Sequence, residues 1–189
     1  MRHPKTLFPS ALNCNLLAEV FPVSATRTPR TLFFAIVFAA IVQAGHDFPL
    51  LPNRLASHFD AAGTPNGWMD KSQFFMIYAV MLVPALIVEF RVSRSIANKP
   101  AASLRLPNKE YWLAPKRRAR TLAYFESFFA WYGCALLFVE VFAMALAMRA
   151  NFVPQPQLPT APIVSLIAGF IVFNVVAVVA MFRRFSIPA

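Results

Sequence analysis

Residues 51–73, LPNRLASHFDAAGTPNGWMDKSQ, separate two apolar runs that are each long enough to form a helix across a membrane. This is the only long polar stretch of the chain whose charge is not simply cationic. Within it, residues 64–67 place a proline before Asn-Gly, which predicts a tight turn. We therefore expect a membrane scaffold that presents an outer loop, residues 49–70, on one side of the bilayer.

The composition excludes an ordinary soluble domain. The 189 residues are 58% hydrophobic and include twenty phenylalanines, and the mean hydropathy is +0.55. A soluble domain of this length cannot bury so much apolar surface. The net charge of +10 would suit nucleic acid, but the basic residues lie between apolar runs rather than on one amphipathic face. We expect the lipid bilayer as solvent and no nucleic-acid partner.

Four apolar runs predict an all-α membrane protein with four transmembrane helices. A two-span module covers residues 29–90 and contains the outer loop, and a second two-span hairpin covers residues 121–182. The remaining segments are a tail at 1–28, expected to be disordered, a basic loop at 91–120 and a short end at 183–189. Pro49 and Pro52 should end the first span, and Pro84 should kink the second.

The second span has the sequence signals of a helix start. Asp70 is placed to cap it, with Gln73 reaching back as in a capping box, and Met69 and Phe74 are spaced as a hydrophobic staple. Glu89 falls at the far end of this span, where we expect it near the headgroups. The third run, residues 121–148, is too long for an upright span and should tilt or project from the bilayer.

The distribution of basic residues predicts the orientation. Fifteen lysines and arginines lie in the first 30 residues, in residues 91–120 and at the end, against Arg54, Lys71 and Arg149 elsewhere. By the positive-inside rule both termini are cytoplasmic and the outer loop faces the exterior. We expect a multi-pass protein of the cell inner membrane.

Polar residues within the spans need partners, because lipid offers them none. Glu126, Gly133 and Glu140 fall close to one stripe of the third helix, so this stripe should face the bundle. Asn174 in the fourth span is a candidate hydrogen-bonding partner. The stripe suits either packing or an ion path.

The outer loop holds the candidate recognition residues. His46-Asp47 and His58 with Asp60 are the only pairs that could ligate a metal, and two loose pairs do not supply a site, so we expect none. Cys14 and Cys134 suggest no disulfide framework. No enzyme signature is present, and we expect neither catalytic residues nor a cofactor. Trp68 suits an interfacial anchor.

Two motifs resemble known sequences. The outer loop resembles the signature of domain of unknown function 1648, a bacterial integral-membrane domain that is also the N-terminal module of SdpI-like toxin-immunity proteins. That signature is a proline, His-Phe, a glycine, Pro-x-Gly-Trp and a lysine. Here it falls on Pro52, His58, Phe59, Gly63, Pro65, Gly67, Trp68 and Lys71.

The cytoplasmic loop carries a second block, LPNKEYWLAPKRRART at residues 106–121, that resembles one seen in longer relatives. The matching residues are Pro107, Asn108, Tyr111, Trp112, Leu113 and Pro115. A simpler interpretation is an interfacial segment whose basic residues meet anionic lipid headgroups. The four-span chain lacks the C-terminal half of the immunity proteins, and the family implies no catalytic residues.

The sequence thus predicts a binding, sensing or protective module that acts through the outer loop. We expect His58, Asp60 and Lys71 to face a protein or peptide partner outside the membrane. The residues expected to fix the scaffold are Pro52, Gly63, Pro65, Asn66, Gly67 and Trp68. The alternatives are a small transporter or ion-path subunit that uses Glu126 and Glu140, and, third, a metal-dependent membrane enzyme.

Overall fold

The computed structural model describes residues 26–92, 95, 100, 103 and 106–186. Four helical segments in this part of the chain are long and apolar enough to cross a membrane: Arg27–Leu50, Lys71–Val92, Pro115–Ala150 and Thr160–Ser186. The predicted four-span helical fold is confirmed, and the chain is a multi-pass membrane protein. Most of the predicted tail at 1–28, Cys14, much of the 91–120 loop and residues 187–189 lie outside the described residues.

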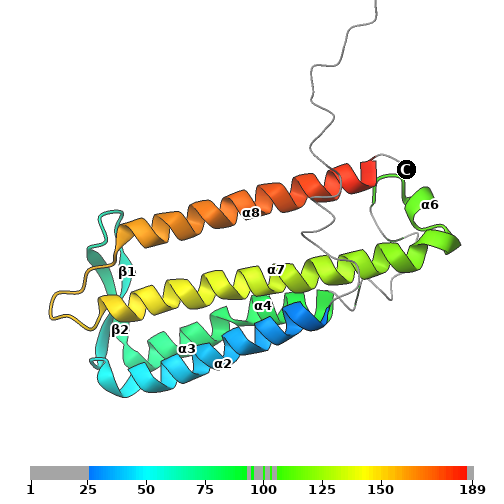
Figure 1. Ribbon diagram of the computed structural model, residues 1–189. Coiled ribbons are helices and arrows are strands. Elements are labelled where there is room, and N and C mark those ends of the chain that lie inside the picture. The colour runs from blue at the N-terminus through cyan, green and yellow to red at the C-terminus, as the bar shows by residue number, and fades with distance from the viewer. Residues whose placement is uncertain (1–25, 93–94, 96–99, 101–102, 104–105, 187–189) are drawn as a thin grey trace, which may run out of the picture.

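The long helices form one bundle with a two-stranded sheet at one end (Figure 1). Helix α2 (Arg27–Leu50) runs toward the sheet, and α3 (Lys71–Met81) and α4 (Val83–Ile87) run back from it. Helices α7 (Pro115–Ala150) and α8 (Thr160–Ser186) complete the bundle. We call the end with the strands the hairpin end. The start of α2, the short α6 (Lys109–Trp112) and the end of α8 lie at the opposite end.

The outer loop is a β-hairpin and not an irregular loop. Strand β1 (Arg54–Phe59) pairs antiparallel with β2 (Pro65–Asp70), with Leu55 opposite Met69. Alternate residues of a strand face opposite sides, and Leu55 and Met69 accordingly pack into the core below the hairpin. The turn predicted at 64–67 was wrong, because residues 65–67 lie in β2 and the chain reverses before them.

Prolines interrupt the spans in two ways. The stop predicted at Pro49 was slightly early, since α2 continues through it to Leu50, and a proline so close to the helix end disturbs only the last turn. The predicted disruption at Pro84 is confirmed, because α3 ends at Met81 and α4 restarts at Val83. A π-helix, η1 (Val88–Val92), comes next, which the sequence did not predict.

Helix α7 is the centre of the packing and contacts α2, α4, η1, α8 and β1. Its 36 residues cover about 54 Å at 1.5 Å per residue, so it extends beyond a hydrocarbon core of about 30 Å. It contributes to all three buried clusters. One lies below the hairpin around Leu55, Phe74 and Met148, one between α2, α4 and α7 around Phe33 and Leu137, and one between α7 and α8 around Tyr124 and Phe185.

Candidate functional site

The hairpin is fastened to the chain that leaves α7. The carboxamide of Asn151, which is buried, accepts a hydrogen bond from the backbone N–H of Ala56 at 2.8 Å and donates one to the carbonyl of the same residue at 2.9 Å. It also donates to the carbonyl of Ala147 at 2.8 Å. One side chain thus makes both bonds that a neighbouring strand would make to β1. Asn151 is not among the residues predicted from the sequence.

The tip of the hairpin is built by Asp60 and Gly63. The Asp60 carboxylate accepts hydrogen bonds from the backbone N–H groups of Ala62 and Thr64, both at 2.9 Å. Gly63 has φ +81°, a conformation that favours glycine. This local turn places the reversal at residues 60–64 rather than at 64–67, and it explains why the predicted turn was wrong.

The same tip is docked on the α7–α8 connection. The backbone N–H of Leu158 donates to the carbonyl of Gly63 at 3.0 Å, and the Gln157 side chain donates to the carbonyl of Ala62 at 2.9 Å. A Cβ atom at Gly63 would collide with the carbonyl oxygen of Leu158. Gly63 is therefore required both for the turn and for the close approach of the two segments, and the scaffold role predicted for it has a physical basis.

His58 and Gly67 pack against each other across the two strands. A Cβ atom at Gly67 would come within 2.9 Å of the His58 Cβ atom, so only glycine fits there with His58 in this position. The His58 ring is exposed and its Nδ1 atom lies 3.1 Å from the Ser57 hydroxyl. The polar and aromatic side chains exposed on the two strands are those of Arg54, His58, Asn66, Trp68 and Asp70.

The other predicted residues of this region tie the hairpin to the helices. The Lys71 ammonium donates to the carbonyl of Leu51 at 2.9 Å and lies 4.8 Å from the centre of the Phe48 ring, so it joins the end of α2 to the start of α3. Asp70 is the N-cap residue of α3, as predicted, but its side chain makes no capping hydrogen bond. Pro52 is exposed just before β1.

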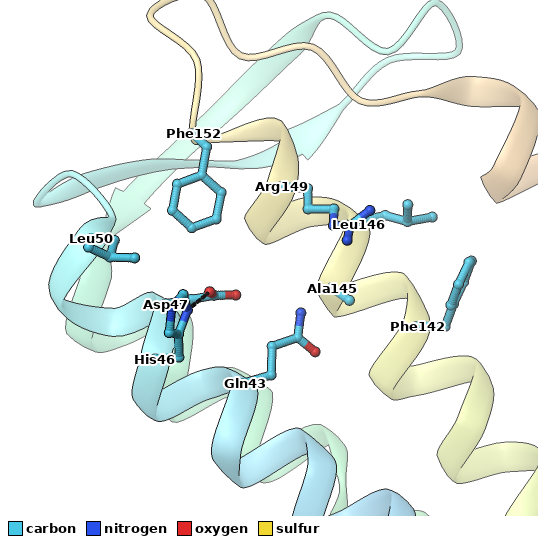
Figure 2. Close-up of a pocket in the computed structure, with 9 residues that line it drawn as sticks. All are labelled: Gln43, His46, Asp47, Leu50, Phe142, Ala145, Leu146, Arg149 and Phe152. Atoms are coloured by element: carbon cyan, nitrogen blue, oxygen red, sulfur yellow. Dashed lines mark hydrogen bonds and ion pairs between the residues drawn. The ribbon is translucent and has the colours of Figure 1, made fainter.

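A cavity of about 630 Å³ lies at the hairpin end, between the last turns of α2 and α7 (Figure 2). Its polar lining consists of Gln43, His46, Asp47 and Arg149, and its apolar lining includes Phe142, Leu146 and Phe152. The His46 ring nitrogen Nδ1 lies 2.9 Å from the buried Asp47 carboxylate. In Figure 2 the Gln43 and Asp47 side chains extend from α2 into the gap that faces α7.

An ion cluster joins three helices toward the opposite end. The Arg30 guanidinium lies 3.4 Å from Glu89 and 3.0 Å from Glu126, so one cation from α2 meets carboxylates from η1 and α7. Glu89, predicted at the headgroup end of its span, has only 1% of its side chain exposed and packs against Gly133. Of the predicted stripe of Glu126, Gly133 and Glu140, the first two thus contact neighbouring helices of the bundle.

Glu140 and Asn174 do not meet, contrary to the prediction. Asn174 accepts a hydrogen bond from the Tyr132 hydroxyl at 2.9 Å and donates to the carbonyl of Phe170 at 2.7 Å. The Glu140 carboxyl is instead within electrostatic reach of Tyr78 on α3. The buried Glu140 Oε2 atom and the Tyr78 hydroxyl both lack a hydrogen-bond partner among the described residues.

The second motif closes the end of α8. The Asn108 side chain donates to the carbonyls of Phe185 and Ser186 at 3.1 and 2.9 Å, and the Trp112 indole donates to that of Phe185 at 3.1 Å. These carbonyls have no partner within the helix itself, so the motif acts as a cap. Tyr111 stacks with the Arg117 guanidinium at 3.8 Å. Pro107 precedes Asn108, which adopts φ 50°.

The described residues contain no group of three or more His, Cys, Asp or Glu side chains that could hold a metal ion. His46–Asp47 and His58 with Asp60 thus remain separate pairs within that part of the chain. Cys134 is buried, and its thiol donates to the carbonyl of Pro29 at 2.9 Å.

Comparison with known proteins agrees with the first of the two sequence resemblances. Residues 32–82, which run from the first turns of α2 through the hairpin to the end of α3, match the family model described as Domain of unknown function (DUF1648). No curated protein and no solved structure matches the chain. The segment that carries the hairpin is therefore a domain of the DUF1648 family.

Proposed function

We propose that the protein is a binding module that presents the face of its hairpin to a protein or peptide partner outside a bacterial inner membrane, and that it is not an enzyme. The observation that carries this proposal is the fastening of the hairpin. Four hydrogen bonds join it to residues 151–158, about 95 positions away in sequence.

An isolated two-stranded hairpin is at best marginally stable in water, so these bonds give the segment one shape. A simple connection between two spans could be much shorter and would need no such support. Fixing a surface in advance lowers the ordering cost of binding. A role in recognition would therefore account for the hydrogen bonds that hold the hairpin in one shape.

The chemistry of the exposed face suits a protein or peptide surface. It combines Arg54, Asp70 and the polar Asn66 with His58 and the half-exposed Trp68. Tryptophan and arginine are the residues that most often dominate binding energy at protein interfaces. Of the predicted recognition residues, His58 belongs to this face, whereas Asp60 and Lys71 make bonds that hold the hairpin itself.

The orientation is part of the proposal. In the described chain the hairpin end carries Arg54, Lys71 and Arg149, and most other basic side chains are at the opposite end. The positive-inside rule then makes the opposite end cytoplasmic. The exposed Lys116, Arg117 and Arg120 would then meet anionic lipid headgroups.

Site-specific photocrosslinking in living cells tests the binding role. A photoreactive residue at Asn66 should give a discrete protein adduct, and the same residue at the lipid-facing Phe138 should not. The adduct should be lost when His58 and Trp68 are both replaced by alanine in protein that still folds and inserts. An adduct that survives this double replacement, or no adduct at Asn66, would contradict the proposal.

A second candidate function, an ion-path subunit, rests on the unsatisfied Glu140 and Tyr78 groups. Glu126 is held by Arg30 and is unsuited to a mobile charge. If this function applies, wild-type protein in liposomes should conduct protons and Glu140→Gln should not. Equal proton flux in liposomes with the wild-type protein and with Glu140→Gln would contradict the ion-path function.

A further inference from the structure

The cavity between α2 and α7 lies where a bilayer changes from hydrocarbon to headgroups. The 24 residues of α2 cover about 36 Å, about 6 Å more than the hydrocarbon core of about 30 Å, so its last turn reaches the edge of the headgroup layer. His46 and Asp47 lie at this end of α2, and Gln43 lies one turn deeper than Asp47. On α7, Ala145 and Leu146 lie one turn deeper than Arg149, and Phe142 lies two turns deeper. The cavity thus crosses this boundary: Leu50 and Phe152 lie nearest the water, Asp47 and Arg149 follow, and Gln43 and Phe142 lie deepest.

The charges in the cavity are of both signs and stand apart. Asp47 is 7% exposed, and its carboxylate lies 2.9 Å from the Nδ1 atom of His46. Arg149 on the facing helix is exposed and forms none of the ion pairs found among the described residues. A nearly buried carboxylate and a separate guanidinium across one opening are complementary to a molecule that carries both charges itself.

We propose that this cavity holds the headgroup of a zwitterionic phospholipid with a primary ammonium and a phosphate. The ammonium would donate to the Asp47 carboxylate, the phosphate oxygens would accept from Arg149 and Gln43, and the acyl chain would lie along Phe142 and Leu146. The volume of about 630 Å³ is within the usual range of small-molecule sites. This site is separate from the exposed face of the hairpin.

The lining also discriminates between headgroups. A quaternary ammonium has no N–H group to donate to Asp47, and a glycerol headgroup has no ammonium to pair with that carboxylate. Full-length wild-type protein in detergent can be incubated with dioleoyl phosphatidylethanolamine, phosphatidylcholine or phosphatidylglycerol, and native mass spectrometry then counts the lipid retained. Phosphatidylethanolamine should be retained about tenfold more tightly than either of the others. Equal retention of the three lipids, or preference for another, would overturn the assignment.

Charge variants test the two contacts separately. Asp47→Asn should abolish the preference for phosphatidylethanolamine over phosphatidylglycerol, whereas Arg149→Gln should weaken retention of both about tenfold. The matched controls are Asp70→Asn and Arg54→Gln, which change the same groups on the hairpin outside the cavity and should retain lipid as wild type does. Wild-type lipid selectivity in Asp47→Asn, or wild-type lipid retention in Arg149→Gln, would refute the proposal.

A third variant leaves every charge in place. Ala145→Phe fills the cavity and should displace the lipid, while Ala168→Phe adds the same ring to an exposed position of α8 and should not. This pair decides the matter even if Asp47→Asn does not fold. Undiminished retention in Ala145→Phe would place the lipid elsewhere.

Discussion

Asn151 does for β1 what a third strand would otherwise do, and it does so with one buried side chain. We predict that Asn151→Ala releases the hairpin, because it leaves the N–H and carbonyl of Ala56 without partners at a cost of about 1–3 kcal/mol. Hydrogen exchange at residues 54–70 should accelerate and the melting temperature should fall. Asn66→Ala, at an exposed position of the same hairpin, should change neither. Unchanged exchange in Asn151→Ala would contradict this account of the hairpin.

The ion cluster gives a second prediction for single residues. Arg30→Gln should destabilise the fold because it removes the guanidinium that lies 3.4 Å from the buried Glu89 carboxylate. The loss should be less than the about 3–5 kcal/mol of a fully buried pair, since a third of the Arg30 side chain is exposed to solvent screening. The double variant Arg30→Gln, Glu89→Gln should recover part of the loss.

Thermal unfolding in detergent measures the coupling between the two positions. The control is Arg27→Gln, which removes an exposed arginine one turn earlier in α2. Additive effects of the two single changes would show that Arg30 and Glu89 do not interact.

These two residue-scale features differ in how far the sequence could predict them. Arg30 begins the first span, Glu89 ends the second and Glu126 opens the third, so antiparallel spans place all three at one depth, and the sequence held that signal. Asn151 had no such sequence signal. An asparagine after a helix is common, and its hydrogen bond to Ala56 depends on where the hairpin docks. The sequence can predict contacts between residues that lie at the same depth in the membrane. It cannot predict contacts that depend on how the hairpin packs against the helices.

At the scale of helices and strands, α7 packs closely against η1 because residue 133 is a glycine. A Cβ atom at Gly133 would meet the Glu89 side chain at 3.3 Å and its backbone nitrogen at 3.5 Å, so a larger side chain must push η1 away. We predict that Gly133→Leu lowers the yield of folded protein in size-exclusion chromatography much more than Ala135→Leu, which lies on the same helix. Equal yields would show that the two helices have room to separate.

The next prediction concerns the hydrogen bonds from Asn108 and Trp112 that cap the last turn of α8. Asn108→Gly keeps the backbone conformation at φ 50° but removes the donors to Phe185 and Ser186, and Trp112→Phe keeps a ring but removes the indole N–H. Each change should fray the last turn of α8, at about 0.5–1.5 kcal/mol per lost hydrogen bond. Faster hydrogen exchange at residues 183–186 would report it. Lys109→Ala, next to Asn108 but without these bonds, should have no such effect.

The sequence predicted the helices better than the hairpin, for a physical reason. Apolar runs and prolines mark the spans, because every span needs about twenty apolar residues. In the outer loop two turn signals compete. Pro65 with Asn66-Gly67 is the stronger by composition, but the Asp60 carboxylate and the left-handed Gly63 make the actual turn. The docking of Gly63 on Leu158, absent from any local pattern, favours the latter.

At the scale of the whole molecule the prediction concerns its orientation. In a background without Cys14 and Cys134, cysteines at Asn66 and at Gln155, both exposed at the hairpin end, should react with a membrane-impermeant thiol reagent in intact cells. A cysteine at Lys116, exposed at the opposite end, should react only after lysis. Labelling of Lys116→Cys alone would reverse the orientation and place the hairpin in the cytoplasm.

The docking of the hairpin has one more consequence, which concerns inheritance rather than binding. The DUF1648 match ends at residue 82, yet the bonds that shape its hairpin come from Asn151, Gln157 and Leu158. A gene rearrangement that transferred residues 32–82 alone would leave those partners behind. The segment that matches the family model is thus smaller than the segment that must be copied together for the hairpin to keep its shape.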